Sequence, residues 1–260
     1  MLVLLRNSGE GFVPPSSADF DFKPIFGDSI FFTKPVFLVA LSVILISTFF
    51  IISARKAAVV PSKMQFAGEA VYGFVRNTIG REVIGPEFMR FVPFLFTVFV
   101  FVLTNNIFGV VPFLQFPTMS RIGFPIAITL VSYVVYHWVA IGKHGFFKYM
   151  KDIMFMPGIP KPVYLILTPV EIATYFITRP LTLAMRLFAN MFAGHLLLLI
   201  FTLGGEYLLT SGLLMKFLSL FSFSFAVGLS FFELGIQFLQ AYIFTLLTAL
   251  YIAGALADEH

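Results

Sequence analysis

The chain has 260 residues, of which 59% are hydrophobic and only 12% are charged. Soluble domains carry about 25% charged residues, so this composition excludes an ordinary soluble protein and indicates a membrane protein. The formal net charge of +4 is too diffuse to predict nucleic-acid binding, and the absence of cysteine excludes disulfides and thiol chemistry.

Residues 1–34 are predicted to form an irregular tail, because Pro14-Pro15-Ser16-Ser17 and scattered acidic residues interrupt the sequence. The opening apolar run ends at Arg6 and is too short for the apolar region of a signal peptide. Residues 35–260 are then expected to form a single multi-span membrane domain. Pro35–Ser53 is a stretch of 19 uncharged residues, long enough for a first span across about 30 Å of hydrocarbon.

Residues 54–90 are predicted to contain an amphipathic helix that lies in the membrane interface. One face follows helical spacing and is formed by Ala67, Ala70, Val71, Phe74, Val75, Thr78 and Ile79. A short soluble helix between spans is the alternative. The segment contains six basic residues, so the positive-inside rule predicts that it is cytoplasmic.

Two further spans are predicted over Phe91–Leu114 and Gly123–Ile141. Asn105 and Asn106 interrupt the first of these, and we expect them to bond neighbouring helices. His137 lies near the end of the second, which is typical of an interfacial residue rather than a proton carrier. The connection between the two spans has one basic residue, whereas residues 143–162 hold four lysines. The positive-inside rule therefore predicts a cytoplasmic second loop and an N-terminus outside.

Residues 163–257 are predicted to form a long helical hairpin. Its two apolar stretches, Val163–Leu203 and Leu213–Ala257, would measure about 60 and 68 Å as helices, roughly twice the hydrocarbon thickness. Each is either two short spans or one strongly tilted helix, and the polar residues favour tilting. The break between the stretches is predicted at Gly204-Gly205-Glu206. The fold is thus predicted to be an all-α membrane protein with about three upright spans, an interfacial amphipathic helix and a C-terminal hairpin of two long tilted helices.

The first helix of this hairpin carries polar residues within an apolar run. Arg179, Thr182 and Asn190 each fall within about 40° of Arg186 on one helix face. His195 points to the opposite face, roughly 13 Å along the axis from Arg186. A charge at mid-membrane costs about 2.5–3.5 kcal/mol on insertion scales, so an ionisable group there predicts a functional site. Two polar regions that face different ways suit an ion path made of two unconnected halves.

The last helix carries a second polar stripe, formed by Ser230, Glu233, Gln237 and Gln240. Two glutamines alone are typical of hydrogen bonds between helices. A carboxylate at this depth must in addition be paired, hydrated or neutral.

Two sequence blocks resemble subunit a of the F-type ATP synthase. They are Arg186-Leu187-Phe188-Ala189-Asn190-Met191 with Ala193-Gly194-His195, and Gln237-Phe238-Leu239-Gln240-Ala241-Tyr242-Ile243-Phe244-Thr245-Leu246-Leu247. The resemblance implies two long, nearly horizontal helices that lie against a ring of identical subunits, the c-ring. It favours a bacterial, actinobacterial-type protein of the plasma membrane, with the mitochondrial inner membrane as the alternative.

The resemblance implies a proton-conducting stator subunit with two offset half-channels to the c-ring, which couples proton flow to ATP synthesis. Proton translocation would then use Arg186 as the barrier between the halves, together with His195, Glu233, Gln240 and Asn190. The candidates for the cytoplasmic half-channel are Thr178, Arg179 and Thr182. The roles of Glu171 and Gln237 stay open.

His195 and Glu233 are expected to form one proton-relay unit in the outer half-channel. A static contact between the two helices is the alternative. With a turn at Gly205, their meeting would require a loop of roughly 10–18 residues or a strong stagger between the two helices, at 1.5 Å rise per residue.

The expected partners are the c-ring, the subunit b peripheral stalk, the lipid bilayer and, indirectly, the soluble catalytic head. No nucleic acid, cofactor or metal is expected, and the chain has no phosphate-binding glycine loop, so we expect a non-catalytic subunit. A proton- or sodium-coupled secondary transporter is the alternative, although such proteins usually show internal repeats and we find none. Four histidines without an HExxH motif argue against a metalloenzyme.

Overall fold

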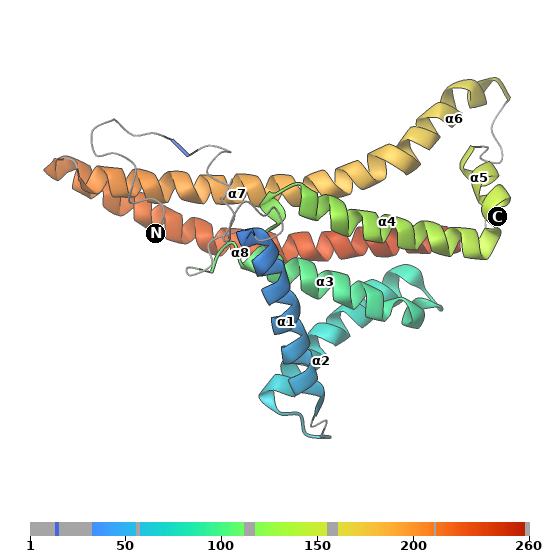
Figure 1. The fold of residues 1–260 in the computed structure, drawn as a ribbon, viewed down its shortest axis with the longest axis horizontal. Coiled ribbons are helices and arrows are strands. Elements are labelled where there is room, and N and C mark those ends of the chain that lie inside the picture. The colour runs from blue at the N-terminus through green and yellow to red at the C-terminus, as the bar shows by residue number, and fades with distance from the viewer. Residues whose placement is uncertain are drawn as a thin grey trace.

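The computed structural model describes residues 14–15, 33–55, 58–111, 118–154, 161–210 and 212–257, so nearly all of the predicted tail 1–34 lies outside the described residues. The described chain is almost entirely helical (Figure 1). Its α-helices are α1 (Lys34–Arg55), α2 (Lys63–Phe74), α3 (Val92–Ile107), α4 (Gly123–His144), α5 (Phe146–Met154), α6 (Tyr164–Ala173), α7 (Arg179–Leu209) and α8 (Leu213–Leu256). The π-helical segments are η3 (Val75–Ile84) and η7 (Thr174–Thr178), and the 3-10 turns are η4 (Phe88–Arg90), η5 (Thr118–Ser120) and η6 (Lys161–Val163).

Four helical rods in the described residues are long and apolar enough to cross a membrane: α1, α4, the continuous rod Tyr164–Leu209, and α8. The apolar helix α3 is shorter, with 16 residues. The prediction of an all-α membrane protein is confirmed. The first and third predicted spans coincide with α1 and α4, and the end of the second predicted span, beyond residue 111, lies outside the described residues.

The two longest rods form an antiparallel hairpin that runs the length of the molecule, and α1 crosses it steeply (Figure 1). The rod Tyr164–Leu209 is continuous, and α8 is one unbroken helix of 44 residues. The alternative of two short spans in each apolar stretch is therefore wrong. The first rod bends between α6 and α7 (Figure 1), where η7 widens the helix. Pro169 lies inside α6 and Pro180 in the first turn of α7. Proline and π-helical turns both interrupt the regular ladder of helix hydrogen bonds, which explains the bend.

The break predicted at Gly204-Gly205-Glu206 is wrong, because α7 continues through these residues to Leu209 and α8 begins at Leu213. The Ser219 hydroxyl of α8 donates a hydrogen bond to the Gly205 carbonyl at 2.8 Å. A Cβ atom at Gly205 would lie 3.1 Å from the Phe223 ring. This glycine therefore allows two helices to pack closely, which is a common use of glycine in membrane helices, and does not end the helix.

α8 is the helix on which most of the others pack, with α3, α4, α7 and η3 around it. The centre of the core consists of fully buried apolar side chains, among them Leu95, Phe99, Leu187, Phe244 and Ile252. The predicted amphipathic segment forms α2 and η3, and its apolar face ends in this core, with Val75 and Ile79 completely buried. That part of the apolar face is buried against the protein's own helices. The position of the segment in the membrane interface stays a prediction.

Polar contacts between helices support the same arrangement. Asn105 of α3 donates a hydrogen bond to the Ser42 hydroxyl of α1 at 3.0 Å and accepts one from Thr118 at 2.9 Å. Asn106 donates to the Gln237 carbonyl of α8 at 3.5 Å. The expected interhelical role of both asparagines is confirmed. His137 packs in an aromatic cluster, with its ring centroid 4.1 Å from that of Tyr133, and its expected position at the membrane interface stays a prediction.

Candidate functional site

Arg186 is an exposed charge on the outer surface of α7. Within the described residues it makes no hydrogen bond and no ion pair. The exposed polar residues Thr182 and Asn190 lie one turn before and after it on the same face. Exposed apolar side chains lie around the helix from this face, with Leu181 54% and Met185 40% exposed. Because a guanidinium on an apolar membrane surface is strongly unfavourable without a counter-charge or water, this face is suited to a partner that supplies one.

Asn190 joins this open face to the interior of the hairpin. It lies one helical turn after Arg186 and is also exposed. Its amide Nδ2 donates a hydrogen bond to Oε1 of Gln240, which is buried on α8, at 2.9 Å. The hydrogen bond connects the exposed guanidinium face to the polar stripe of α8.

The polar stripe on α8 is buried at the centre of the molecule. Glu233, Gln237 and Gln240 are at most 6% exposed. Gln237 donates a hydrogen bond to Oε1 of Glu233 at 3.4 Å. Three buried oxygens receive no hydrogen bond from any described residue: Oε2 of Glu233, Oε1 of Gln237 and Oδ1 of Asn106 on α3. Buried polar atoms of this kind are normally satisfied by ordered water, so the stripe is suited to hold water or a mobile proton.

The Glu233 carboxyl group lies against the backbone of α7 at Gly194. A Cβ atom at position 194 would be 3.1 Å from Oε1 of Glu233 and 3.3 Å from its Cδ atom. His195, the next residue, is also buried, at 6% exposure. A cavity of about 220 Å³ opens beside these groups and is lined by Asn190, Gly194 and Glu233 among apolar side chains. Gly194 was not singled out as a site residue from the sequence, although it lies within one of the two quoted blocks.

Because α7 ends at Leu209 and α8 begins at Leu213, Glu233 lies at the level of Gly194, next to His195, without a long loop. The expectation of a 10–18-residue loop or a strong stagger is therefore wrong. It followed from placing the turn at Gly205, several residues too early.

The candidates for the other half-channel lie at the start of α7. Thr178 and Thr182 are exposed, and the Thr182 hydroxyl donates a hydrogen bond to the Thr178 carbonyl at 2.7 Å. Arg179 is half-buried, and its guanidinium carbon lies 3.5 Å from the Tyr175 ring centroid and 5.3 Å from that of Tyr251 on α8. Glu171 lies earlier, on α6, and is half-exposed.

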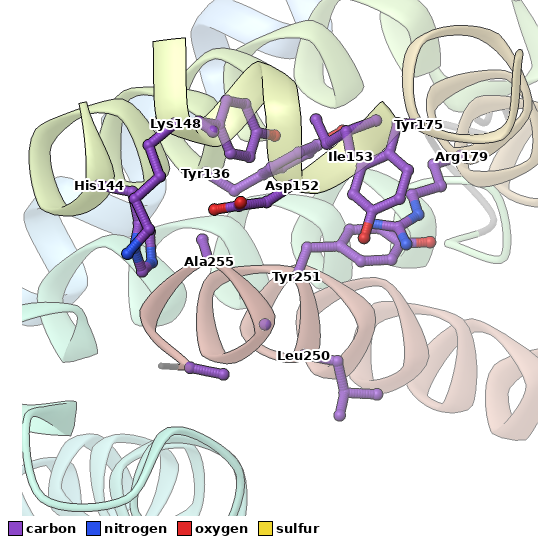
Figure 2. A pocket seen from close by; sticks show the side chains of 13 residues that line it. Tyr136, His144, Lys148, Asp152, Ile153, Tyr175, Arg179, Leu250, Tyr251 and Ala255 are labelled. Carbon is purple, nitrogen blue, oxygen red and sulfur yellow. The ribbon is translucent and has the colours of Figure 1, made fainter. Parts of the chain in front are cut away.

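The aromatic surroundings of Arg179 form one side of a second cavity, of about 210 Å³ (Figure 2). Four tyrosines from separate parts of the chain line it: Tyr136, Tyr149, Tyr175 and Tyr251. Sequence reasoning missed this cluster, because the tyrosines lie on α4, α5, η7 and α8 and share no spacing in the sequence.

The predicted site residues thus fall into two groups. Asn190, His195, Glu233, Gln237 and Gln240 gather where α7 packs on α8, and Arg186 lies just outside this group. Thr178, Arg179 and Thr182 lie further back along the same rod, and Glu171 lines neither cavity. Within the described residues, no three His, Asp or Glu side chains are placed to hold a metal ion.

Comparison with known proteins gives a consistent result. The family model described as ATP synthase A chain matches residues 36–253. A protein of Nocardioides named ATP synthase subunit a is 48% identical, over 99% of this chain and 98% of its own length. Proteins with the same name from Pseudarthrobacter chlorophenolicus and Paenarthrobacter aurescens are 44% and 42% identical, each over at least 97% of both chains.

Proposed function

This chain belongs to the ATP synthase A chain family, and we propose that it is the proton-conducting stator subunit of the membrane sector of an ATP synthase. It would present two offset half-channels to the rotating c-ring and so couple proton flow to ATP synthesis. The relatives whose full length it matches carry the name of a synthase subunit, which supports a place within that complex. It has no catalytic role of its own in this proposal; the soluble head makes the ATP.

The observation that carries the proposal is the position of Arg186. The guanidinium is exposed on the outer surface of α7 without a partner among the described residues, directly outside the buried polar stripe of α8. A mid-membrane carboxylate on a c-ring subunit is the counter-charge that this surface requires. Because the guanidinium stays protonated at any relevant pH, it attracts a deprotonated ring carboxylate and repels an excess proton. It thereby separates the two halves of the path.

The outer half-channel would run through the buried group formed by His195, Glu233 and Gln240, and reach the ring beside Asn190. Oε2 of Glu233 and the nearby Oε1 of Gln237, which no described donor satisfies, are suited to a chain of waters. The hydrogen bond from Asn190 to Gln240 supports the last step, because it links the interior to the Arg186 surface. Thr178, Arg179 and Thr182 would border the cytoplasmic half-channel.

The proposal places the chain in the bacterial plasma membrane, with the c-ring against the open face of α7. The peripheral stalk subunit b would hold it in place against rotation. Large apolar side chains that α7 and α8 leave exposed, such as Leu197 and Phe231, support contact of this surface with lipid or with an apolar ring.

The test is Arg186→Ala in the complete synthase, assayed in inverted membrane vesicles. We expect the complex to assemble but to lose ATP-driven proton pumping, because the ring carboxylate no longer finds its counter-charge. Met185→Ala, an exposed apolar neighbour, is the matched control and should pump normally. Normal pumping by Arg186→Ala would contradict the proposal.

A second arm separates the proposal from secondary transport. The full chain alone, reconstituted in liposomes without a c-ring, should not catalyse proton- or sodium-coupled uptake of a solute. Coupled uptake by the chain alone would favour the secondary transporter instead.

A further inference from the structure

The cavity beside Arg179 holds further basic and hydroxyl side chains to which the proposed function gives no role. It lies where the end of α4, the short helix α5, the η7–α7 junction and the end of α8 meet. Figure 2 shows His144 and Lys148 on one side of the cavity and Tyr175 and Arg179 on the other. Its volume of about 210 Å³ is large enough for a group of several heavy atoms.

The charged side chains that line this cavity are mostly basic. Arg179 and Lys148 are cationic and His144 is a weaker base, whereas Asp152 is the one carboxylate among the lining residues. None of the four makes an ion pair or a hydrogen bond to a described residue. The Tyr175 and Tyr251 rings hold the Arg179 guanidinium by its face, which leaves its N–H donors without acceptors. The cavity therefore has an excess of positive charge and of unused donors.

Tyrosine hydroxyl groups add to the donors in this cavity. Tyr136 is 4% exposed, and its hydroxyl is buried and makes no hydrogen bond to a described residue. Burial raises the pKa of Tyr149 to about 12, so its hydroxyl keeps its proton and can donate. A buried donor without an acceptor is unfavourable, and an oxygen-rich anion would satisfy Tyr136 and Arg179 together.

The cavity lies at a position that suits a phospholipid headgroup. Two rods that can span the membrane, α4 and α8, both end beside it. On α5, Phe146 and Phe147 are 53% and 87% exposed, next to Lys148 and Lys151. Aromatic rings and lysines in this combination are typical of a helix at the membrane surface, where basic pockets bind anionic headgroups.

We propose that this cavity binds a phosphate group, with Arg179, Lys148 and Tyr136 as donors to its oxygens. The phosphate can belong to an anionic phospholipid or to free inorganic phosphate. A lipid seated there would hold together the ends of α4, α5 and α8, the elements that line the cavity. This inference goes beyond the proposed function, in which Arg179 borders the cytoplasmic half-channel but no phosphate group takes part.

Native mass spectrometry of the full chain in detergent tests the proposal. The probes are short-chain phosphatidylglycerol, short-chain phosphatidylcholine and sodium phosphate, each titrated separately. We expect at least one phosphate-bearing anion to remain bound, and phosphatidylglycerol to be retained about tenfold better than phosphatidylcholine, whose headgroup has no net charge. Retention of phosphatidylglycerol without binding of sodium phosphate identifies a lipid site. Binding of sodium phosphate that displaces phosphatidylglycerol identifies a site for the free anion.

Matched variants assign the binding to this cavity. Lys148→Gln and Tyr136→Phe should each weaken retention about threefold to tenfold, the effect of losing one charge-assisted hydrogen bond. Lys151→Gln removes the same charge from the same helix but does not line the cavity, so it should retain the probe normally. Equal retention of both lipids without phosphate binding, or equal effects of Lys148→Gln and Lys151→Gln, would overturn the proposal. Because the readout is retained ligand, a failed proton-pumping assay does not affect the result.

Discussion

Two arginines of α7 lie seven residues apart and have opposite surroundings. Arg186 is exposed on an apolar surface and has no partner among the described residues. Arg179 is half-buried, and two tyrosine rings cover its guanidinium. Helix geometry alone places both side chains on one face, so their positions in the sequence do not distinguish them. Under the proposed function these environments correspond to different tasks: Arg186 would meet a charge on another protein, whereas Arg179 packs within its own chain.

The two arginines should differ most in ATP synthesis when each is replaced by lysine. Arg186→Lys keeps a charge but loses the planar fork that binds a carboxylate, and a lysine in a membrane can lose its proton. We expect ATP synthesis in vesicles to fall about 10³-fold, the upper range for removal of a preorganised electrostatic contact. Arg179→Lys keeps a cation over the tyrosine rings. It should therefore reduce synthesis by less than about threefold, which corresponds to weakening, and not losing, a cation–π contact. Equal losses in the two variants would remove the distinction between the two arginines.

Variants of the predicted proton relay, His195 with Glu233, test whether proton transfer takes place in the interior beside Arg186 and not near Arg179. His195→Glu and Glu233→His should each reduce proton pumping about 10²-fold, the typical effect of losing a positioned acid or base. The double exchange places both groups back in the same space and should recover part of the rate. If the double variant pumps no better than the worse single variant, the two residues form only a static contact between helices.

Helical periodicity in the sequence correctly predicted which residues share a helix face. The prediction failed at glycine, a residue type that occurs both at helix ends and at close helix contacts. Helical spacing placed Glu233, Gln237 and Gln240 in one stripe, and they form one buried stripe. The Gly204-Gly205 pair was interpreted as a break, but Gly205 accommodates the Phe223 ring. Glycine permits both a turn and a close helix contact. Which of the two forms depends on the side chains of the neighbouring helix, and a hydropathy pattern carries no information about them.

The second cavity could not be predicted for a different reason. Tyr136, Tyr149, Tyr175 and Tyr251 come from four elements and meet only in the folded chain. Likewise, the second ring over Arg179 is Tyr251, which reaches it only because α8 packs on α7. Local pattern therefore predicts which face of a helix is polar, whereas tertiary packing decides which of its charges is left for a partner.

Gly194→Ala should have a smaller effect, on the interior side of the Arg186 surface. The new Cβ atom would lie 3.1 Å from Oε1 of Glu233, so the carboxyl group must move by a few tenths of an ångström. We expect proton pumping to fall about tenfold, less than the roughly 100-fold loss that a displacement of 1 Å can cause. Gly235→Ala on α8 is the control, since no heavy atom other than its own chain neighbours and helix backbone lies within 4 Å of its added Cβ. If both variants pump normally, the position of the Glu233 carboxyl group is not critical.

The smallest effect is expected at the tyrosine beneath Arg179, where a change should alter stability and leave coupling intact. Tyr175 lies closest to the guanidinium, at 3.5 Å from ring centroid to the guanidinium carbon. Tyr175→Leu removes the aromatic face and should lower the free energy of unfolding of the purified chain by about 1 kcal/mol, within the range for a cation–π contact. Tyr175→Phe keeps the face and loses only the hydroxyl, so thermal unfolding should show less than half of that effect. ATP synthesis should stay within about twofold of the wild type in both variants, as expected if the loss is confined to a contact of this size. A coupling defect in Tyr175→Leu as severe as that of Arg186→Lys would show that the covered arginine does more than border the proton path.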